Sequence, residues 1–222
     1  MKVTVILIII ILVFAIGAIL FRSILKKENS NIQTENMQTS ENLDIPTNTV
    51  QAMFAGGCFW CMEPAFQRLE GVYDVRSGFT GGTKEDANYY KVASGATNHR
   101  EAIHLLYDPE KITYERLVEV FFWQIDPTDD GGQFADRGHQ YTTAIFYYED
   151  EQKRIAQDYI QKLDTSGEFD KPVVTAVEQA QPFYDAPEEH QDYYLKNPTH
   201  YKLYKKGSGR EDFIEKNNDY QL

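Results

Sequence analysis

Residues 50–69 read VQAMFAGGCFWCMEPAFQRL, and the pattern changes within this stretch in a way that predicts the fold. The first six residues form a short, mostly apolar run that is typical of a buried strand. Gly56 and Gly57 end the run, and residues 58–69 fit a helix, although Pro64 restricts where its first turn can lie. The first cysteine therefore falls where a strand turns into a helix.

The rest of the chain continues with short strands and helices. Strands are expected over residues 72–79, 101–107, 143–148 and 173–177, and helices over 113–125 and 149–163. Strands and helices mix without strict alternation, so the predicted class is α+β, in a single domain. The last forty residues are rich in Tyr, Pro and His with little periodicity, which predicts a long irregular C-terminal segment.

The composition of the 222 residues is globular and acidic. The chain is 42% hydrophobic, and 22 basic against 34 acidic residues give a net charge of −12. Nucleic-acid binding domains normally carry a basic face, so no nucleic-acid partner is expected. Solubility alone is sufficient to explain the acidity.

The first residues predict a membrane anchor. Residues 3–21 read VTVILIIIILVFAIGAILF and carry no charge. At about 1.5 Å per residue this helix would nearly cross a bilayer core. A cleaved signal peptide is the alternative, but its apolar core is usually shorter and ends in an A-x-A-like site. We therefore expect one transmembrane helix within an anchor over residues 1–27.

A polar stretch follows the predicted anchor. Residues 28–48 are rich in Asn, Thr and Ser without periodicity, which predicts a disordered tether. The positive charges of Arg22, Lys26 and Lys27 favour a cytoplasmic location for the chain that follows. A tether instead suits an exported domain, and we expect a single-pass, membrane-anchored protein whose domain, residues 49–222, is extracytoplasmic.

Cys58 and Cys61 are the only cysteines, and they form a C-x-x-C pair. Two cysteines are too few for a disulfide-stapled scaffold or for a four-ligand zinc site. A zinc site that adds His99 and His104 has poor spacing. The remaining alternatives are a redox-active pair and a pair of inert buried cysteines.

The position of Cys58 favours the redox reading. Free amides and the helix dipole at a helix start stabilise a thiolate and predict a lowered pKa for Cys58. Cys61 shares the helix face three residues on, and a strained bridge between them would be easily reduced. Phe59 and Trp60 supply an apolar surface suited to methyl groups and sulfur, unless they are ordinary core residues.

Four motifs in this chain resemble those of the type A peptide methionine sulfoxide reductases. They are GGCFWCME (56–63) and the segments 77–101, 133–148 and 182–214. The resemblance extends from residue 50 to 217, and several motifs in one order are far more specific than a lone C-x-x-C. It implies a two-layer α/β sandwich with a mixed, ferredoxin-like sheet.

The resemblance also implies a role for each matching residue. Cys58 matches the attacking thiolate and Glu101 the family's acid, which a desolvated pocket would keep protonated near neutral pH. Cys61 is the only internal cysteine that could resolve the oxidised Cys58. The substrate pocket is implied for Phe59, Trp60, Tyr89, Asp136 and Tyr141. The sequence departs from the family at Asn98, Thr142 and residues 86–88, where no proposed chemical group is lost.

The activity that follows is reduction of the S epimer of methionine sulfoxide, free or in oxidised proteins, as a repair of oxidative damage. Cys58 becomes a sulfenic acid, Cys61 converts it to a disulfide, and thioredoxin or another dithiol reduces that bond. No metal or other cofactor is expected, and the chain is expected to be a monomer. A thioredoxin-like disulfide oxidoreductase and a tethered peptide-binding module are the alternatives.

Overall fold

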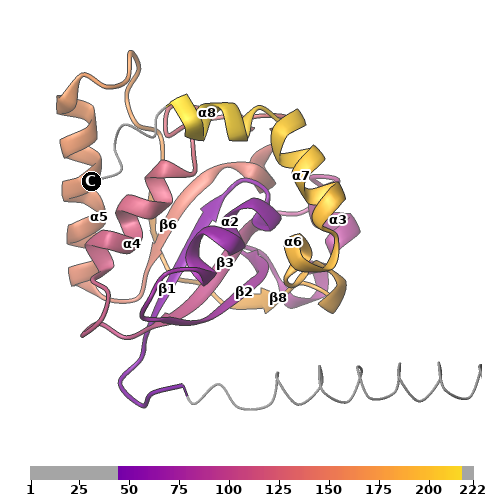
Figure 1. Ribbon diagram of the computed structural model, residues 1–222, viewed down its shortest axis with the longest axis horizontal. Coiled ribbons are helices and arrows are strands. Elements are labelled where there is room, and N and C mark those ends of the chain that lie inside the picture. Colours follow the sequence, from indigo (N-terminus) through magenta and orange to yellow (C-terminus); the bar gives the residue numbers. More distant parts are fainter. Residues whose placement is uncertain (1–44, 217–222) are drawn as a thin grey trace, which may run out of the picture. The chain divides into compact units, whose positions relative to one another are not determined.

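The centre of the sheet is β1 (Val50–Gly56), whose last five residues are buried. The computed structural model describes residues 45–216 of the chain (Figure 1). In it, β1 pairs antiparallel with β3 (Arg100–Tyr107) on one side and with β6 (Thr143–Tyr147) on the other. A strand with neighbours on both sides and cores on both faces must be apolar throughout, which explains its sequence.

Three further strands complete a mixed sheet. β2 (Val72–Thr80) pairs antiparallel with β3, β8 (Phe183–Asp185) antiparallel with β2, and β7 (Ala176–Gln179) parallel with β6. The order is β7-β6-β1-β3-β2-β8, and its four inner strands have the order of a ferredoxin-like sheet. A separate two-stranded hairpin is formed by β4 (Gly132–Gln133) and β5 (Asp136–Arg137).

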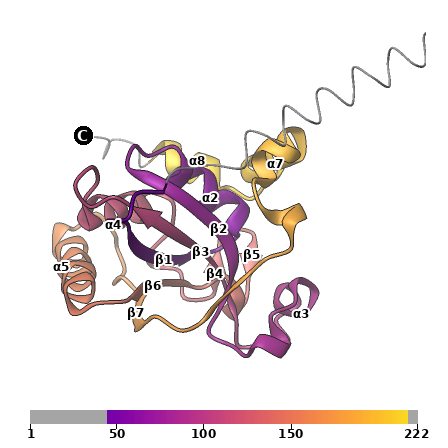
Figure 2. The same cartoon turned by 90° about the horizontal axis from the view of Figure 1, so that it is seen from below.

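Helices α2 (Phe59–Gln67), α4 (Tyr114–Trp123) and α5 (Asp150–Ser166) pack on one face of this sheet (Figures 1 and 2). The ring of Phe54 from β1 stacks on Phe66 of α2 at 5.3 Å and on Phe121 of α4 at 5.2 Å. A smaller cluster that includes Met53 and Phe146 covers the other face. The helix-on-sheet layers therefore agree with the predicted sandwich.

The predicted irregular C-terminal segment contains helices instead. It holds the 3-10 turn η3 (Glu188–His190) and the helices α6 (Tyr193–Lys196), α7 (Pro198–Gly207) and α8 (Arg210–Lys216). The other short elements lie earlier in the chain and are η1 (Lys84–Asp86), α3 (Tyr89–Ala93) and η2 (His139–Tyr141). Neither α6 nor α7 contains a fully buried residue. Their sequences therefore lack the apolar period by which a helix is detected.

The membrane-anchored part of the prediction requires correction. Residues 3–21, the anchor over 1–27 and most of the tether over 28–48 lie outside the described residues. Within residues 45–216, no helix is both long and apolar enough to cross a bilayer. The fold class is therefore corrected to the α+β domain alone, and the predicted membrane-anchored location is withdrawn with the transmembrane helix.

The turn between β1 and α2 requires glycine for two reasons. Gly57 has a φ of +82°, a backbone conformation that costs other residues roughly 1–2 kcal/mol. A Cβ on Gly57 would also lie 2.6 Å from Nη2 of Arg210 and 2.7 Å from Cβ of Gln133. Gly167, after α5, has a similar φ of +76° but nothing within 4 Å of such a Cβ.

These two glycines give a matched pair of variants. Gly57→Ala should lower the free energy of unfolding by roughly 3 kcal/mol, because overpacking of roughly 1–3 kcal/mol adds to the backbone strain. Gly167→Ala should lower the free energy of unfolding only by the backbone strain, roughly 1–2 kcal/mol. Urea unfolding of the full chain measures both, and equal losses would contradict the close packing at Gly57.

Candidate active site

The two cysteines occupy the first turn of α2. Cys58 is the N-cap residue, and the N–H of Cys61 donates a hydrogen bond to its carbonyl oxygen at 3.0 Å. Both are free thiols, buried at 6% and 2% exposure, and their side chains hydrogen-bond each other. The helix start thus brings the two sulfurs together, in the geometry that the C-x-x-C spacing predicted.

Glu101 is placed beside this turn by the register of the sheet. Ile103 of β3 pairs with Phe54 of β1, so Glu101 lies alongside the end of β1 that leads to Cys58. Oε2 of Glu101 accepts a hydrogen bond from the N–H of Phe59 at 3.1 Å. Burial raises the pKa of Glu101 to about 8, against the opposing effect of that hydrogen bond. At neutral pH the carboxyl group therefore keeps its proton.

The lowered pKa predicted for Cys58 is wrong. Burial raises the pKa of the Cys58 thiol well above its ordinary value, and the hydrogen bond with Cys61 and the charges of Glu101 and Asp136 add to the increase. The N–H of Phe59, one of the free amides expected to stabilise a thiolate, is bonded to Glu101 instead. The sequence could not reveal that a strand residue would take this donor.

Cys61 shows the opposite shift. The hydrogen bond with Cys58 lowers the pKa of Cys61 despite its burial, and the positive charges of Arg210 and Lys205 lower it further. Asp136 opposes these effects. The surroundings of Cys61 therefore favour its thiolate, whereas those of Cys58 favour its thiol.

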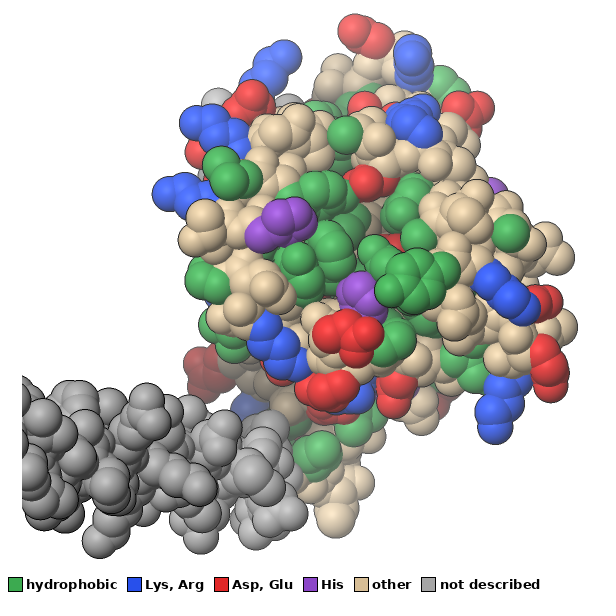
Figure 3. Space-filling model, turned by 90° about the vertical axis from the view of Figure 1, so that its right-hand side faces the viewer, with side chains coloured by type: hydrophobic (Ala, Val, Ile, Leu, Met, Phe, Trp, Pro, Cys, Tyr) green, Lys and Arg blue, Asp and Glu red, His purple; other side chains and the backbone are tan. Residues whose placement is uncertain are grey.

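Aromatic rings form a wall beside Cys58. The ring of Trp60 stacks on Tyr193 at 3.8 Å, and that of Tyr89 stacks on His190 at 3.9 Å. The ring of Phe59 lies between these groups, and its centroid is 6.5 Å from that of Trp60 and 6.4 Å from that of Tyr89. Figure 3 shows hydrophobic side chains around a hollow on this side of the molecule, with two histidines beside them. A small apolar group can bind here without losing a hydrogen bond.

Hydroxyl groups lie on the polar side of the same space. Burial raises the pKa of Tyr89 to about 12 and that of Tyr141 further still. The charges of Glu101 and Cys58 add to the increase in both tyrosines. Asp136 has a raised pKa because of burial, which the hydrogen bond from Tyr204 opposes. The structure therefore groups every residue implied by the resemblance around Cys58.

Four residues of this site were not expected from the sequence. Tyr204 donates a hydrogen bond to Oδ2 of Asp136, and burial, the charge of Cys58 and hydrogen bonds to both residues raise its pKa far above the ordinary value. His190 accepts a hydrogen bond from Nε1 of Trp60 at 3.3 Å. Tyr193 and Arg210 also belong to this environment. All four lie in the Tyr- and His-rich C-terminal segment, whose unusual composition was the available signal.

The set of groups suits one kind of chemistry. Within residues 45–216, no cluster of three or more His, Cys, Asp or Glu side chains is arranged to hold a metal ion. A protonated carboxyl group and tyrosine hydroxyls can donate hydrogen bonds to a substrate oxygen. A thiol beside them can attack the atom bonded to that oxygen, and a second thiol is in contact with the first.

A comparison with protein families identifies the group to which this chain belongs. The model of the peptide methionine sulfoxide reductases matches residues 50–222. The chain belongs to the peptide methionine sulfoxide reductase family. The resemblance seen in the sequence, and the prediction that the protein is an enzyme, are thereby confirmed.

Individual members of the family agree with this assignment. The peptide methionine sulfoxide reductase MsrA of Bacillus velezensis is 51% identical over 164 residues, which are 74% of this chain and 93% of the relative. Methionine sulfoxide reductase A of Corynebacterium diphtheriae matches with a TM-score of 0.61 and 30% identity over 69% of this chain and 77% of its own. The reduced form of Mxr1 from Saccharomyces cerevisiae matches with the same TM-score and 29% identity over 69% and 88%.

The raised pKa of Glu101 predicts how stability depends on pH. Glu101 holds its proton in the folded state up to about pH 8, but loses it near pH 4.5 when unfolded. Unfolding therefore releases a proton between these values, and stability falls as the pH rises. Glu101→Gln removes this titration and should stabilise the fold by up to about 3 kcal/mol at pH 7 and by almost nothing at pH 4. Urea unfolding at both pH values measures the difference, and a gain independent of pH would contradict the buried, protonated carboxyl group.

Proposed function

We propose that residues 49–222 catalyse reduction of the S epimer of methionine sulfoxide, free or in oxidised proteins, with Cys58 as the nucleophile. One observation carries this assignment: a buried, protonated Glu101 is bonded to the first turn of the helix that carries Cys58. A hydrogen-bond donor for the sulfoxide oxygen and a sulfur nucleophile are thus fixed beside one another. Membership of the family supports the same reaction.

Substrate binding uses both sides of the site. The substrate methyl group packs against the rings of Phe59 and Trp60, where sulfur and methyl groups make favourable contacts. The sulfoxide oxygen turns to the polar side, toward Glu101, Tyr89 and Tyr141. Binding the oxygen and the methyl group on opposite sides fixes the chirality at sulfur, which supports selection of one epimer.

The first chemical step is an exchange of protons with attack at sulfur. Glu101 gives its proton to the sulfoxide oxygen and receives the thiol proton of Cys58, whose raised pKa makes it a poor nucleophile until that transfer. The Cys58 sulfur attacks the substrate sulfur, and the hydroxyl group passes from the substrate to Cys58 as the substrate S–O bond breaks, so that methionine leaves as a thioether and Cys58 becomes a sulfenic acid. Cys58 is oxidised by two electrons, and the substrate sulfur is reduced by two.

The second step joins the two cysteines. The sulfur of Cys61 attacks the sulfur of the Cys58 sulfenic acid, the S–O bond breaks, and water leaves with a proton from Glu101. A thioredoxin-like protein or a small dithiol then reduces the Cys58–Cys61 disulfide by exchange and is itself oxidised. These steps use thiols as the only source of electrons.

A single turnover separates the roles of the two cysteines. The reduced full chain is mixed with excess methionine S-sulfoxide without reductant, and methionine and free thiols are counted. Wild type should form one methionine per chain and lose both thiols. Cys61→Ser should form one methionine and keep a trappable sulfenic acid, and Cys58→Ser should form none. Disulfide exchange without methionine would instead favour a thioredoxin-like oxidoreductase.

Loss of a proton donor should slow the first step. Glu101→Gln should reduce the rate of methionine formation in single turnover by roughly 10²–10³-fold, because a positioned donor to developing charge is removed. Glu63→Gln is the matched control. Burial raises the pKa of Glu63 to about 7 as well, but its carboxylate accepts the N–H of Asp192 and has no proposed part in the reaction. If both variants react at the wild-type rate, Glu101 is not the acid.

A further inference from the structure

Arg210 is a buried cation without an ion-pair partner. It is 1% exposed, and no carboxylate within residues 45–216 forms a salt bridge with it. Its guanidinium donates instead to backbone oxygens, from Nη1 to Gln124 at 2.7 Å and from Nη2 to Gly56 at 2.8 Å. Burying a charge without a counter-charge is costly, so a nearby group that can become an anion is expected.

The hydrogen bonds of Arg210 place it against the cysteine turn. Gly56 is the last residue of β1, and a Cβ on Gly57 would touch Nη2 of the arginine. Nη1 also lies 3.5 Å from Sδ of Met62, the residue after Cys61. Arg210 is therefore fixed beside the first turn of α2, where the two sulfurs lie.

Three acidic groups lie near this turn. Glu101 is protonated at neutral pH. The charge of Arg210 and the hydrogen bond from Tyr204 both lower the pKa of Asp136, against the effect of its burial. The charge of Arg210 also lowers the pKa of Cys61, so this thiol is a second group that the cation stabilises as an anion.

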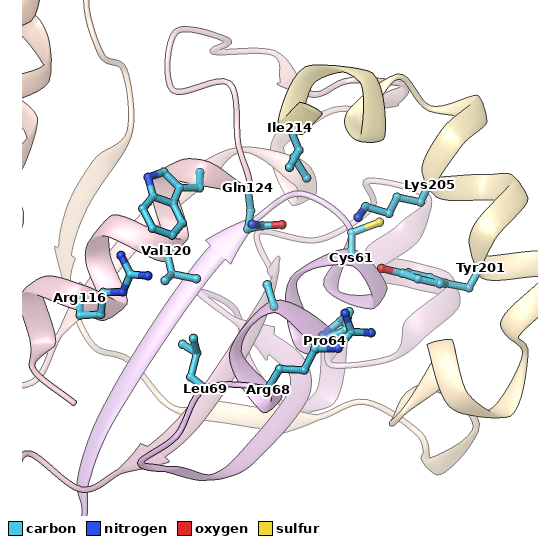
Figure 4. Close-up of a pocket in the computed structure, with 12 residues that line it drawn as sticks. Cys61, Pro64, Arg68, Leu69, Arg116, Val120, Gln124, Tyr201, Lys205 and Ile214 are labelled. Atoms are coloured by element: carbon cyan, nitrogen blue, oxygen red, sulfur yellow. The ribbon is translucent and has the colours of Figure 1, made fainter. Parts of the chain in front are cut away.

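A second cation, Lys205, also lies beside Cys61. Cys61 lines a pocket of about 260 Å³ together with Lys205 and Tyr201 of α7. Figure 4 shows the sulfur of Cys61 pointing toward these two side chains. Lys205 makes no salt bridge within the described part of the chain, so its charge is available to the sulfur.

We propose that Arg210 and Lys205 are positioning residues that favour the thiolate of Cys61 for its attack on the Cys58 sulfenic acid. This proposal rests on the proposed function. The thiolate forms the S–S bond while the S–O bond of the sulfenic acid breaks, and the departing hydroxide takes a proton to leave as water. The C-terminal helices thus supply the charge that the resolving step needs.

Several titratable groups act on Cys61 or line the pocket beside it, and Arg68 and Arg116 also border that pocket. Arg210 and Lys205 favour the thiolate, and so does the hydrogen bond from Cys58. Asp136 opposes it, and the charges of Glu101 and of the Tyr201 hydroxyl are each coupled to Cys61. Both of the latter are protonated at neutral pH and add no negative charge.

The test measures the resolving step as a function of pH. The reduced full chain reacts with methionine S-sulfoxide without reductant and is quenched at intervals with dimedone, which traps the sulfenic acid. Intact mass then gives the fractions of sulfenic acid and disulfide from pH 5 to 9.5. The variants are Lys205→Met, Arg210→Gln and Arg210→Lys. Lys206→Met, which removes an exposed charge from the same helix, is the matched control.

Loss of a cation should shift the pH dependence of the resolving rate, and should not lower the rate equally at every pH. Each unit by which the pKa of Cys61 rises should slow resolution about threefold at low pH, because fewer thiolates form but each is more nucleophilic. At high pH, where Cys61 is fully ionised in every variant, the more basic thiolate should react about threefold faster per pKa unit, so that the profiles cross. Arg210→Gln should shift the profile more than the half-exposed Lys205→Met. Arg210→Lys keeps the positive charge, so its profile should lie close to that of wild type, and the profile of Lys206→Met should match wild type.

The possible failures are distinguishable. An unshifted profile in Lys205→Met and Arg210→Gln, or a loss equal at every pH, would overturn the proposal and leave Arg210 a structural residue. If the Arg210 variants do not fold, the comparison of Lys205→Met with Lys206→Met decides it. If wild type itself forms no methionine, the proposed function fails before the resolving step is reached.

Discussion

The hydrogen bond from the N–H of Phe59 to Glu101 is the interaction on which this site depends. It joins the start of α2 to the central strand β3 at 3.1 Å. The bond fixes an acid beside the nucleophile and occupies an amide that would otherwise stabilise a Cys58 thiolate. This contact makes Glu101 a positioned proton donor, and burial is the main reason why the pKa of Cys58 is raised and the residue remains a thiol until substrate arrives.

The two cysteines are three residues apart but have different electrostatic surroundings. Cys58 faces the acidic groups Glu101 and Asp136, whereas Cys61 is influenced by Arg210 and Lys205. This difference suits two successive nucleophiles, since the first must wait for a substrate whose oxygen Glu101 protonates. The second must act as soon as the sulfenic acid forms, because an unresolved sulfenic acid is open to further oxidation.

The local pattern around the cysteines predicted most of the domain. The apolar run of β1, the glycine break and the helix after it appear where the sequence placed them. Thr113 accepts the N–H of Arg116, so the predicted start of α4 is also correct. The C-terminal helices were missed because they are short and bury little. The transmembrane helix also had to be corrected, since within the described residues no helix could cross a bilayer.

The sequence by itself determined the reactive pair, the strand-to-helix turn that carries it and, through the family motifs, the residues that surround it. These features depend on local spacing and residue type, which can be read directly from the amino-acid sequence. Only the tertiary structure decided the ionisation of the two thiols. Their pKa values depend on burial and on charges more than forty residues away, at Glu101, Lys205 and Arg210, and no local pattern contains those distances.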